Sequence, residues 1–427
     1  MFISHSSLWS NLNCVNADKT RVYLERSGSS PISVQLRRDF GLPSLDTFHQ
    51  IISQAIGQLK SLSVSTEPGD LENVISHLFH PAPHLETLDI DGRCYDGPLY
   101  NPVLTPMIFN GDLSSLRGLY LHRIRTELPW RNMVNLTSFK LSSSSAGNFG
   151  KLLDFFESAP HLRNIDLLYT TLVPGGENGR SILLDHLEKM EIIDCGPTSI
   201  LLDHLVIPVG AKLVSKSSSG AFEDRVPRSL DNLKNLASVA KIHLHLDEFQ
   251  PRFVRLSGPH GQLCIMSMRT IIPPNLAFES LARFDTSKTK RLRIDSSSGP
   301  LSRDLPYRAL LPMENLRILV LSRCTGLLCA FMDALNPNTS PSKEVICPSL
   351  EEVVFVLHFL EDDEEEFDMQ AVIEMTAARA ARGAKLGTIK DKAELDPADV
   401  LELRKHVLHV KYGSEVDLRE VGKDDSD

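Results

Sequence analysis

The sequence predicts an α/β solenoid, in which short parallel strands stack into one curved sheet and helices line its outer side. Three observations support this prediction. A six-residue frame, apolar-x-x-apolar-x-apolar, recurs along most of the chain. The segments 82–90 and 159–167 both begin Ala-Pro-His-Leu and carry an Asp after three further residues. Apolar residues at helical spacing fill the segments between the early copies.

Eight clear copies define the period of this frame. Their apolar positions are Leu59/Leu62/Val64, Leu85/Leu88/Ile90, Leu116/Leu119/Leu121, Leu136/Phe139/Leu141, Leu162/Ile165/Leu167, Leu187/Met190/Ile192, Leu316/Leu319/Leu321 and Leu350/Val353/Phe355. Subtracting the first positions of the early copies gives spacings of 26, 31, 20, 26 and 25 residues. Leucine-rich repeats have a period of about 20–29 residues, so we predict a leucine-rich-repeat-like fold with irregular repeats.

The frame has a direct physical interpretation. Its last two apolar positions lie two residues apart and therefore share one face of a strand. A strand this short cannot bury that face alone, so neighbouring copies must stack. Leucine-rich repeats also carry Asn or Cys three residues after the third apolar position. Cys195 and Cys324 occupy this place, and Ser144 and Thr170 occupy it in other copies.

Helices are predicted between the early strands. Apolar residues keep helical spacing over 45–56, 71–79 and 149–156, with Ser44 as the expected N-cap of the first helix. The prolines after Phe79 should end the second helix. From about 206 to 298 the frame blurs. Strands are expected there at 241–246, 263–268 and 291–295, and surface loops at 215–220 and 296–300.

Composition narrows the function. The chain has 427 residues, 42% hydrophobic residues and a net charge of −10, which argues against general nucleic-acid binding. No run approaches the ~18 apolar residues of a membrane span. Seven cysteines, an odd number, favour a reducing compartment, so we expect a cytoplasmic or nuclear protein. Glu361–Asp368 contains seven acids and is expected to be a solvated loop or, alternatively, a docking strip for a basic partner.

The sequence carries no strong motif for catalysis or metal binding. His77, His80 and His84 surround a predicted helix end, and His243 and His245 share one face of a strand, but neither set has a strong metal-site pattern. Cys324, Cys329 and Cys347 lack paired CxxC spacing. There is no phosphate-loop or nucleophile-elbow motif. We therefore predict no catalytic residue, no cofactor and no metal, and an enzyme is the least favoured interpretation.

The strand residues that flank the apolar positions should point away from the core and form a concave binding face. They are Thr87, Asp89, Asp91, Tyr120, His122, Ser138, Lys140, Ser142, Asn164, Asp166 and Leu168. Tyr120 is the expected aromatic anchor, with Leu168 adding apolar contact. The three aspartates favour a Lys- or Arg-rich segment of a protein partner. The alternative is a face that is simply solvated.

Both ends of the chain resemble a known family. Ser7-Leu8-Trp9-Ser10-Asn11, the segment 23–28 and Ser30-Pro31-Ile32 resemble the region just after the F-box in fungal, especially basidiomycete, F-box proteins. The segments 377–386 and 400–407 resemble the closing helices of those proteins. In that family Ser-Leu-Trp closes the F-box. Because Met1 lies six residues before Ser7, we expect the F-box to be missing here or to lie upstream of a truncated start.

This resemblance suggests three regions and a function. Residues 1–40 would follow an F-box, 41–360 would form the leucine-rich-repeat-like solenoid, and 361–427 would form an acidic loop and a C-terminal cap. The family implies a substrate-recognition subunit of a Skp–cullin–F-box ubiquitin ligase, with the Skp adaptor bound only if an F-box exists upstream. The alternative is a stand-alone protein-binding module with no ligase link. Neither a nucleic acid nor a membrane is an expected partner.

Overall fold

The computed structural model shows an α/β protein. It describes residues 5–14, 16–37, 45–92, 102–105, 107–127, 132–173, 175, 179–196, 198–217, 227, 232–236, 239–246, 252–258, 261–267, 274–296, 304–323, 325–356, 368–393 and 395–416. These residues include ten α-helices and a mostly parallel sheet of 17 strands. The chain divides into two compact units. Unit 1 comprises 1–213 with 227–234, and unit 2 comprises 214–226 with 235–427.

The main strands of unit 1 include all six early copies of the repeat frame. They are β1 (Asn11–Asn13), β2 (Ile32–Arg37), β3 (Leu59–Thr66), β4 (Thr87–Gly92), β6 (Gly118–His122), β8 (Ser138–Ser142), β10 (Asn164–Leu168) and β13 (Lys189–Ile193). Each strand pairs in parallel with the next one in this series. The second apolar position of each copy stays in register from Leu62 to Leu88 and on to Met190. The strands predicted from the frame are confirmed.

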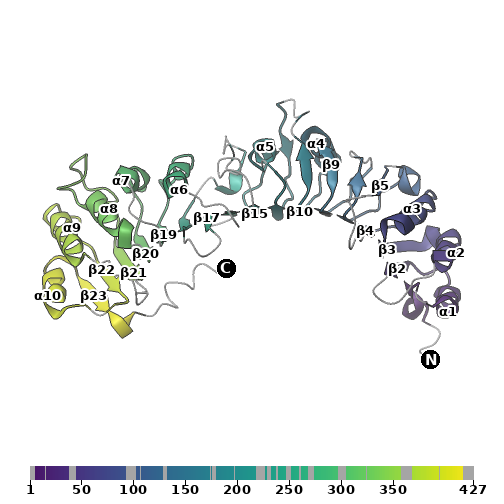
Figure 1. The fold of residues 1–427 in the computed structure, drawn as a ribbon, viewed down its shortest axis with the longest axis horizontal. Coiled ribbons are helices and arrows are strands. Elements are labelled where there is room, and N and C mark those ends of the chain that lie inside the picture. Colours follow the sequence, from purple (N-terminus) through teal and green to yellow (C-terminus); the bar gives the residue numbers. More distant parts are fainter. Residues whose placement is uncertain are drawn as a thin grey trace. The chain divides into compact units, whose positions relative to one another are not determined.

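The described part of unit 1 also contains short second strands and five α-helices. A four-stranded sheet joins β5 (Val103–Leu104), β7 (Arg125–Thr126), β9 (Ser145–Asn148) and β11 (Thr171–Val173), and β12 (Ile182–Leu183) pairs with β14 (Leu205–Val206). The helices are α1 (Ala17–Ser27), α2 (Leu45–Ala55), α3 (Pro68–Ser76), α4 (Phe149–Ser158) and α5 (Thr198–Asp203). Figure 1 shows α2, α3 and α4 on one side of the unit 1 strands.

One predicted helix lies closer to the N-terminus than expected, because it begins at Pro68. Helix α3 ends at Ser76 rather than at Phe79, because the chain tightens there into three-residue turns. The N–H of His77 bonds to the carbonyl of Val74, and that of Leu78 to the carbonyl of Ile75. Leu78 is still buried, whereas Phe79 is exposed. Ser44, the predicted N-cap of the first helix, lies outside the described residues.

The residue three positions after the third apolar residue of the frame forms a hydrogen bond with the backbone of the preceding repeat. The thiol of Cys195 donates to the carbonyl of Leu167 at 3.1 Å, and the hydroxyl of Thr170 donates to that of Leu141 at 3.0 Å. Both carbonyls belong to the preceding repeat. A buried carbonyl left without a partner is costly, so a small donor is favoured at this place. Cys324 lies outside the described residues.

Unit 2 combines parallel strands with an antiparallel excursion. Its strands are β16 (Lys241–His245), β17 (Arg252–Ser257), β18 (Gln262–Ser267), β19 (Arg291–Asp295), β20 (Ile318–Ser322), β21 (Glu352–Val356), β22 (Thr388–Asp391) and β23 (His409–Tyr412). β16 pairs antiparallel with β17, and β17 with β18, whereas β16 pairs in parallel with β19. From β19 to β23 all pairings are parallel.

The helices of unit 2 are α6 (Pro274–Leu281), α7 (Asp304–Leu310), α8 (Thr325–Leu335), α9 (Met369–Ala381) and α10 (Pro397–His406). Strand β15 (Lys212–Ser217) crosses the division between the units. The predicted loop at 215–220 is wrong in its first part, because Ser215–Ser217 belong to this strand. Ser215 and Ser217 are buried, alternating with Lys216, so strand periodicity outweighs the serine content. Ser296, also expected in a loop, is fully buried.

Two further predictions concern the ends of the chain. The segment 377–386 begins on α9, which ends at Ala381, and the segment 400–407 falls almost entirely on α10. Of the acidic stretch, only Asp368 is described. It caps α9 by accepting a hydrogen bond from the N–H of Ala371 at 3.1 Å. No helix within the described residues combines the length and the apolar character needed to cross a membrane.

Candidate functional site

Five of the predicted face residues meet at one pocket in unit 1. The pocket measures about 260 Å³ and is lined by Arg37, Ser65, Asp89, Asp91, Tyr120, Leu121, His122 and Lys140. Parallel register places them there. Asp89 on β4 lies opposite Tyr120 on β6, which lies opposite Lys140 on β8. Neighbouring strands are about 4.8 Å apart, so side chains from three strands reach the same space.

Tyr120 owes its position to a glycine on its own strand. A Cβ added to Gly118 would lie 3.0 Å from a ring carbon of Tyr120 and 3.2 Å from its hydroxyl oxygen. The ring therefore lies back over Gly118, along the strand, and covers it. This leaves Tyr120 half-buried on the sheet face.

The two acids of the pocket are held by serines of the preceding strand. The hydroxyl of Ser63 donates to Asp89 at 3.0 Å, and that of Ser65 donates to Asp91 at 3.1 Å. Burial raises the pKa of Asp89, and the negative charge of Asp91 acts in the same direction. The Ser63 hydrogen bond and the charges of Arg37 and Lys140 oppose this rise in the pKa of Asp89.

His122 completes the polar side of the pocket. Its Nε2 lies 3.9 Å from Oδ1 of Asp91. Burial lowers the pKa of His122, and the positive charges of Arg123 and Lys140 lower it further, while Asp91 and Asp89 oppose the shift. A lowered pKa keeps the imidazole neutral near pH 7, so one ring nitrogen can donate a hydrogen bond and the other can accept one.

The remaining predicted residues lie outside this pocket, on β4, β8 and β10. Asp166 faces Lys140 across the β8–β10 pair and lies 3.9 Å from the ammonium of Lys189. Thr87 and Leu168 are half-buried, and Asn164 is exposed. Arg37 and Ser65 line the pocket but were not among the predicted face residues. Both lie at positions that alternate with the inward-facing apolar residues of β2 and β3, so extending the flanking-position rule toward the N-terminus would have found them.

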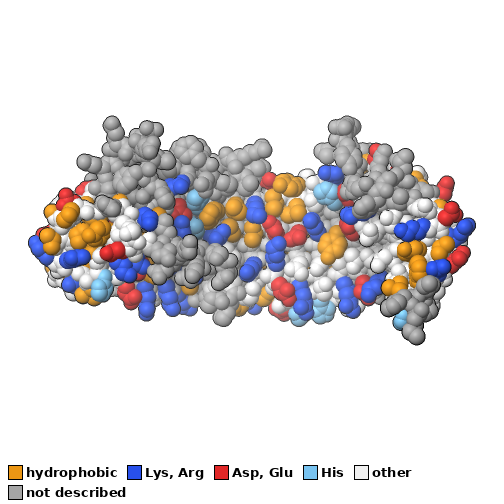
Figure 2. Space-filling view, turned by 90° about the horizontal axis from the view of Figure 1, so that it is seen from below, with side chains coloured by type: hydrophobic (Ala, Val, Ile, Leu, Met, Phe, Trp, Pro, Cys, Tyr) orange, Lys and Arg blue, Asp and Glu red, His pale blue; other side chains and the backbone are white. Residues whose placement is uncertain are grey.

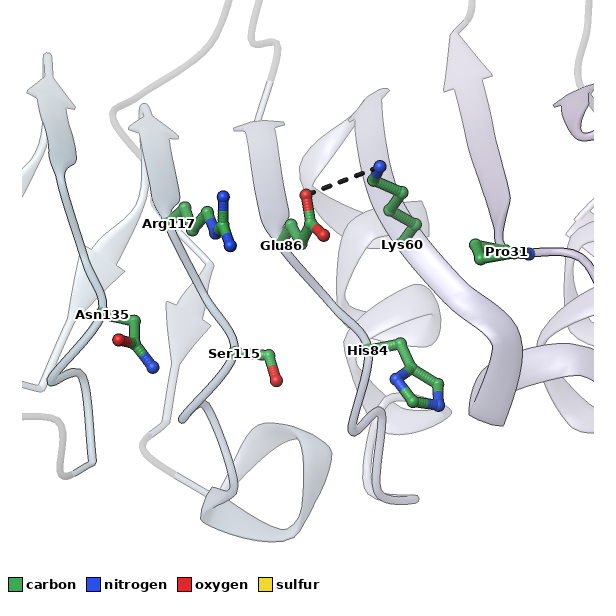
Figure 3. A pocket seen from close by; sticks show the side chains of 7 residues that line it. All are labelled: Pro31, Lys60, His84, Glu86, Ser115, Arg117 and Asn135. Carbon is green, nitrogen blue, oxygen red and sulfur yellow. Dashed lines mark ion pairs between the residues drawn. The ribbon is translucent and has the colours of Figure 1, made fainter.

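A second pocket of unit 1 lies where the chain enters the strands (Figure 3). It measures about 290 Å³ and is lined by Pro31, Lys60, His84, Glu86, Ser115, Arg117 and Asn135. The ammonium of Lys60 lies 3.7 Å from the carboxylate of Glu86. Surface pairs of this kind contribute little to stability. The lining is polar and of mixed charge, like that of the first pocket. Acidic, basic and hydrophobic side chains are also interspersed over the face of the molecule in Figure 2.

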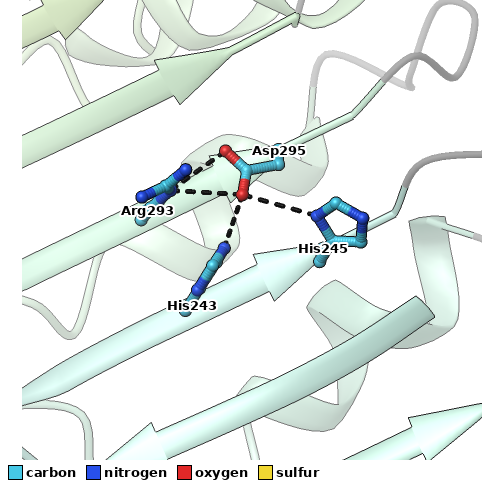
Figure 4. Close-up of polar contacts among 4 residues, drawn as sticks. All are labelled: His243, His245, Arg293 and Asp295. Atoms are coloured by element: carbon cyan, nitrogen blue, oxygen red, sulfur yellow. Dashed lines mark hydrogen bonds and ion pairs between the residues drawn. The ribbon is translucent and has the colours of Figure 1, made fainter. Parts of the chain in front are cut away.

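Unit 2 contains a tighter polar cluster (Figure 4). Nε2 of His243 lies 2.6 Å from Oδ2 of Asp295, and Nδ1 of His245 lies 3.4 Å from the same oxygen. Nε of Arg293 donates to both carboxylate oxygens, at 3.0 and 3.1 Å. Burial alone would raise the pKa of Asp295, but the hydrogen bonds from His243 and His245 and the nearby positive charges hold it well below its usual range.

The other histidines considered from the sequence do not form such a group. Within the described residues, His243, His245 and Asp295 are the one set of three ligand-type side chains whose ligand atoms lie within 4.8 Å of one another. His77 instead stacks on His49, with ring centroids 3.6 Å apart, and Nδ1 of His77 lies 2.8 Å from the Asn73 carbonyl oxygen.

Comparison with known proteins does not assign the chain to a family. No protein-family description matches the sequence, and no curated protein matches it significantly.

Proposed function

We propose that this chain is a non-catalytic, protein-binding leucine-rich-repeat-like solenoid whose unit 1 strand face contacts its partner. One observation carries the proposal: Asp89, Asp91, Tyr120, His122 and Lys140, chosen from sequence as face residues, line a single pocket. An aromatic side chain surrounded by held polar groups is typical of interface anchors. The pocket is small and of mixed charge, which suits one side chain of a protein segment better than a whole small molecule.

The charges in the pocket change which kind of partner we expect. The aspartates alone favoured a Lys- or Arg-rich segment, but Arg37 and Lys140 line the same space as Asp89 and Asp91. The cations balance the acids when both are ionised. We therefore propose that the partner presents an extended segment with residues of both charges, and that one apolar or aromatic side chain of it packs on the ring of Tyr120.

The proposed route to a ligase rests on the family resemblance. In that case the bound partner is a substrate, and the chain acts as the recognition subunit of a Skp–cullin–F-box ubiquitin ligase. The alternative is a binding module with no ligase link. Isolation of the protein as its own cells make it, followed by mass spectrometry, separates these two functions. Stoichiometric Skp supports the first, and its absence from an otherwise intact partner complex supports the second.

The binding face is tested with a charge reversal and a matched control. Tyr120→Ala with Lys140→Glu removes the anchor and reverses one pocket charge. Lys151→Glu makes the same charge change at an exposed position of α4. Peptides are selected by display on the wild-type chain, and the affinities of the purified peptides are measured. We expect at least tenfold weaker binding to the double variant and unchanged binding to the control. Equal binding to all three folded proteins contradicts the proposal.

A further inference from the structure

We propose that His243, His245 and Asp295 form a binding site for a divalent transition-metal ion of the zinc class on the sheet face of unit 2. Two imidazoles and one carboxylate are ligands that zinc accepts in proteins, with water filling the fourth position. The three side chains come from adjacent parallel strands, and their ligand atoms are already gathered within 4.8 Å of one another.

The backbone places these groups. His243 and His245 lie two residues apart on β16 and therefore share one face of the strand. The β16–β19 register sets His245 directly opposite Asp295 and His243 opposite Arg293. The side chains of His243, His245 and Asp295 are only 12%, 13% and 8% exposed. Ordering them for an ion therefore costs less than it would at a mobile surface, because folding has already fixed the groups.

Side chains on the neighbouring strands hold the ligand rings and the carboxylate. Phe253 on β17 stacks on His245, with ring centroids 5.0 Å apart and planes 11° from parallel. The same ring meets His243 edge-on at 4.8 Å. Arg293 holds both oxygens of Asp295. Support of this kind for the ligand rings and the carboxylate is what metal sites use to set ligand orientation.

Ion binding requires only small movements. Bonds of about 2.0–2.1 Å in tetrahedral geometry set neighbouring ligand atoms roughly 3.3 Å apart. Nδ1 of His245 already lies 3.4 Å from Oδ2 of Asp295. Nε2 of His243 lies 2.6 Å from the same oxygen, so these two atoms must move apart. The ion takes the lone pair of Nε2 on His243 and of Nδ1 on His245. Each neutral imidazole then carries its proton on the other ring nitrogen. Nitrogen-containing ligand sets favour Zn²⁺, Co²⁺ or Ni²⁺ over Mg²⁺ or Ca²⁺.

Arg293 gives the proposal a distinctive signature. Its guanidinium is a fixed positive charge beside Asp295, and it opposes an incoming cation. Arg293→Gln removes this charge while keeping a side chain that can donate to the carboxylate. We therefore expect Arg293→Gln to bind the ion several-fold more tightly than the wild type. A purely structural ion-pair network predicts no such gain.

The test is a Co²⁺ titration of the purified full chain, read by visible absorption and by displacement with Zn²⁺. We expect one equivalent of nitrogen- and oxygen-coordinated Co²⁺ in the wild type. Binding should weaken at least tenfold in His245→Gln and in Asp295→Asn. His122→Gln is the matched control, because His122 is also a strand-face histidine beside an aspartate but lies outside this cluster. It should bind like the wild type.

Several results would overturn the site. A wild type that binds neither Co²⁺ nor Zn²⁺ at micromolar concentration is the first. Unchanged binding in both cluster variants is the second, and its loss in His77→Gln would then assign the ion to the stacked His49–His77 pair. Zn²⁺ should also raise the melting temperature of the wild type and of His122→Gln but not of His245→Gln. This second readout needs no knowledge of the protein's partner.

Discussion

The two units use the same inward-facing frame but treat the opposite face of their strands differently. In unit 1 this face carries half-buried polar side chains such as Asp89, Tyr120 and Lys140. In unit 2 the corresponding positions include Val320, Val354 and Val356, which are buried in one cluster with Ile318 packed against it. The frame therefore fixes one face of each strand, and the flanking residues decide whether the other face is open to a partner.

The two units also differ in which polar side chains they bury. Among the described residues, every buried polar side chain of unit 1 is a serine or threonine. Unit 2 buries Arg291, Asp295, Arg379 and Asp391 as well. Hydroxyls can satisfy backbone groups at little cost, whereas buried charges are expensive unless they are paired. Unit 1 thus resembles a stack of apolar repeats, and unit 2 depends on specific polar contacts. Four substitutions test this difference.

The largest effect is expected in the apolar frame that both units share. Leu88 is fully buried and in register with Leu62 and Leu119. Leu88→Asp places an unpaired charge in the core and should lower the free energy of unfolding by about 5 kcal/mol or more. Thr87→Asp, one residue earlier on the half-buried face, should cost about 1 kcal/mol or less. Chemical denaturation measures both, and similar midpoints for the two variants contradict the assignment of faces.

A buried cation is expected to matter next, and only in unit 2. Arg379 on α9 is fully buried and donates to the carbonyls of Ile346 and Cys347, at 2.8 and 2.9 Å. Arg379→Met leaves these carbonyls without the guanidinium donors and should destabilise the protein by about 2–4 kcal/mol. Arg382→Met is the control, since Arg382 is exposed and donates to one carbonyl, that of Lys343. Equal stability of the two variants in urea denaturation would show that Arg379 is not a structural anchor.

The third prediction uses the pH dependence of a buried acid in unit 2. Burial raises the pKa of Asp391 from 3.8 to about 6. A hydrogen bond from the N–H of Ala393 acts in the opposite direction and lowers this pKa. The folded state therefore keeps a proton that the unfolded state releases near pH 4. Stability from this group is fully present below about pH 4, falls as pH rises, and levels off above about pH 6.

Asp391→Asn does not titrate and should lack this fall. The variant's free energy of unfolding, measured relative to the wild type, should rise by about 3 kcal/mol between pH 4 and pH 7.5, from about two pKa units at 1.36 kcal/mol each. Taking the difference cancels the other titrating groups. Unfolding curves at several pH values provide the measurement. A difference that stays constant with pH would mean that Asp391 titrates alike in both states.

Local patterns in the sequence were enough to predict the strands of unit 1, because each apolar frame reports its own buried face. They also placed Asp89, Tyr120 and Lys140 on one face, since the register follows from the repeat. These patterns could not predict that Asp295 lies beside His243 and His245. The strands β17 and β18 interrupt the repeat between them, and about 50 residues separate the partners, so no period signals the pairing. Tyr120's dependence on Gly118 is likewise a packing fact that hydrophobic periodicity does not encode.

The smallest expected effect concerns the strand face that carries the residues flanking the apolar positions. Val320→Thr keeps the shape of a fully buried side chain but adds a hydroxyl, and it should cost about 1–2 kcal/mol. Asn164→Thr introduces the same residue on the exposed face of β10 and should change the free energy of unfolding by less than about 0.5 kcal/mol. Equilibrium denaturation resolves this difference. Equal costs would mean that the two faces are alike in solution. The contrast that singles out unit 1 as the binding surface would then rest on charge alone, and a partner could equally occupy unit 2.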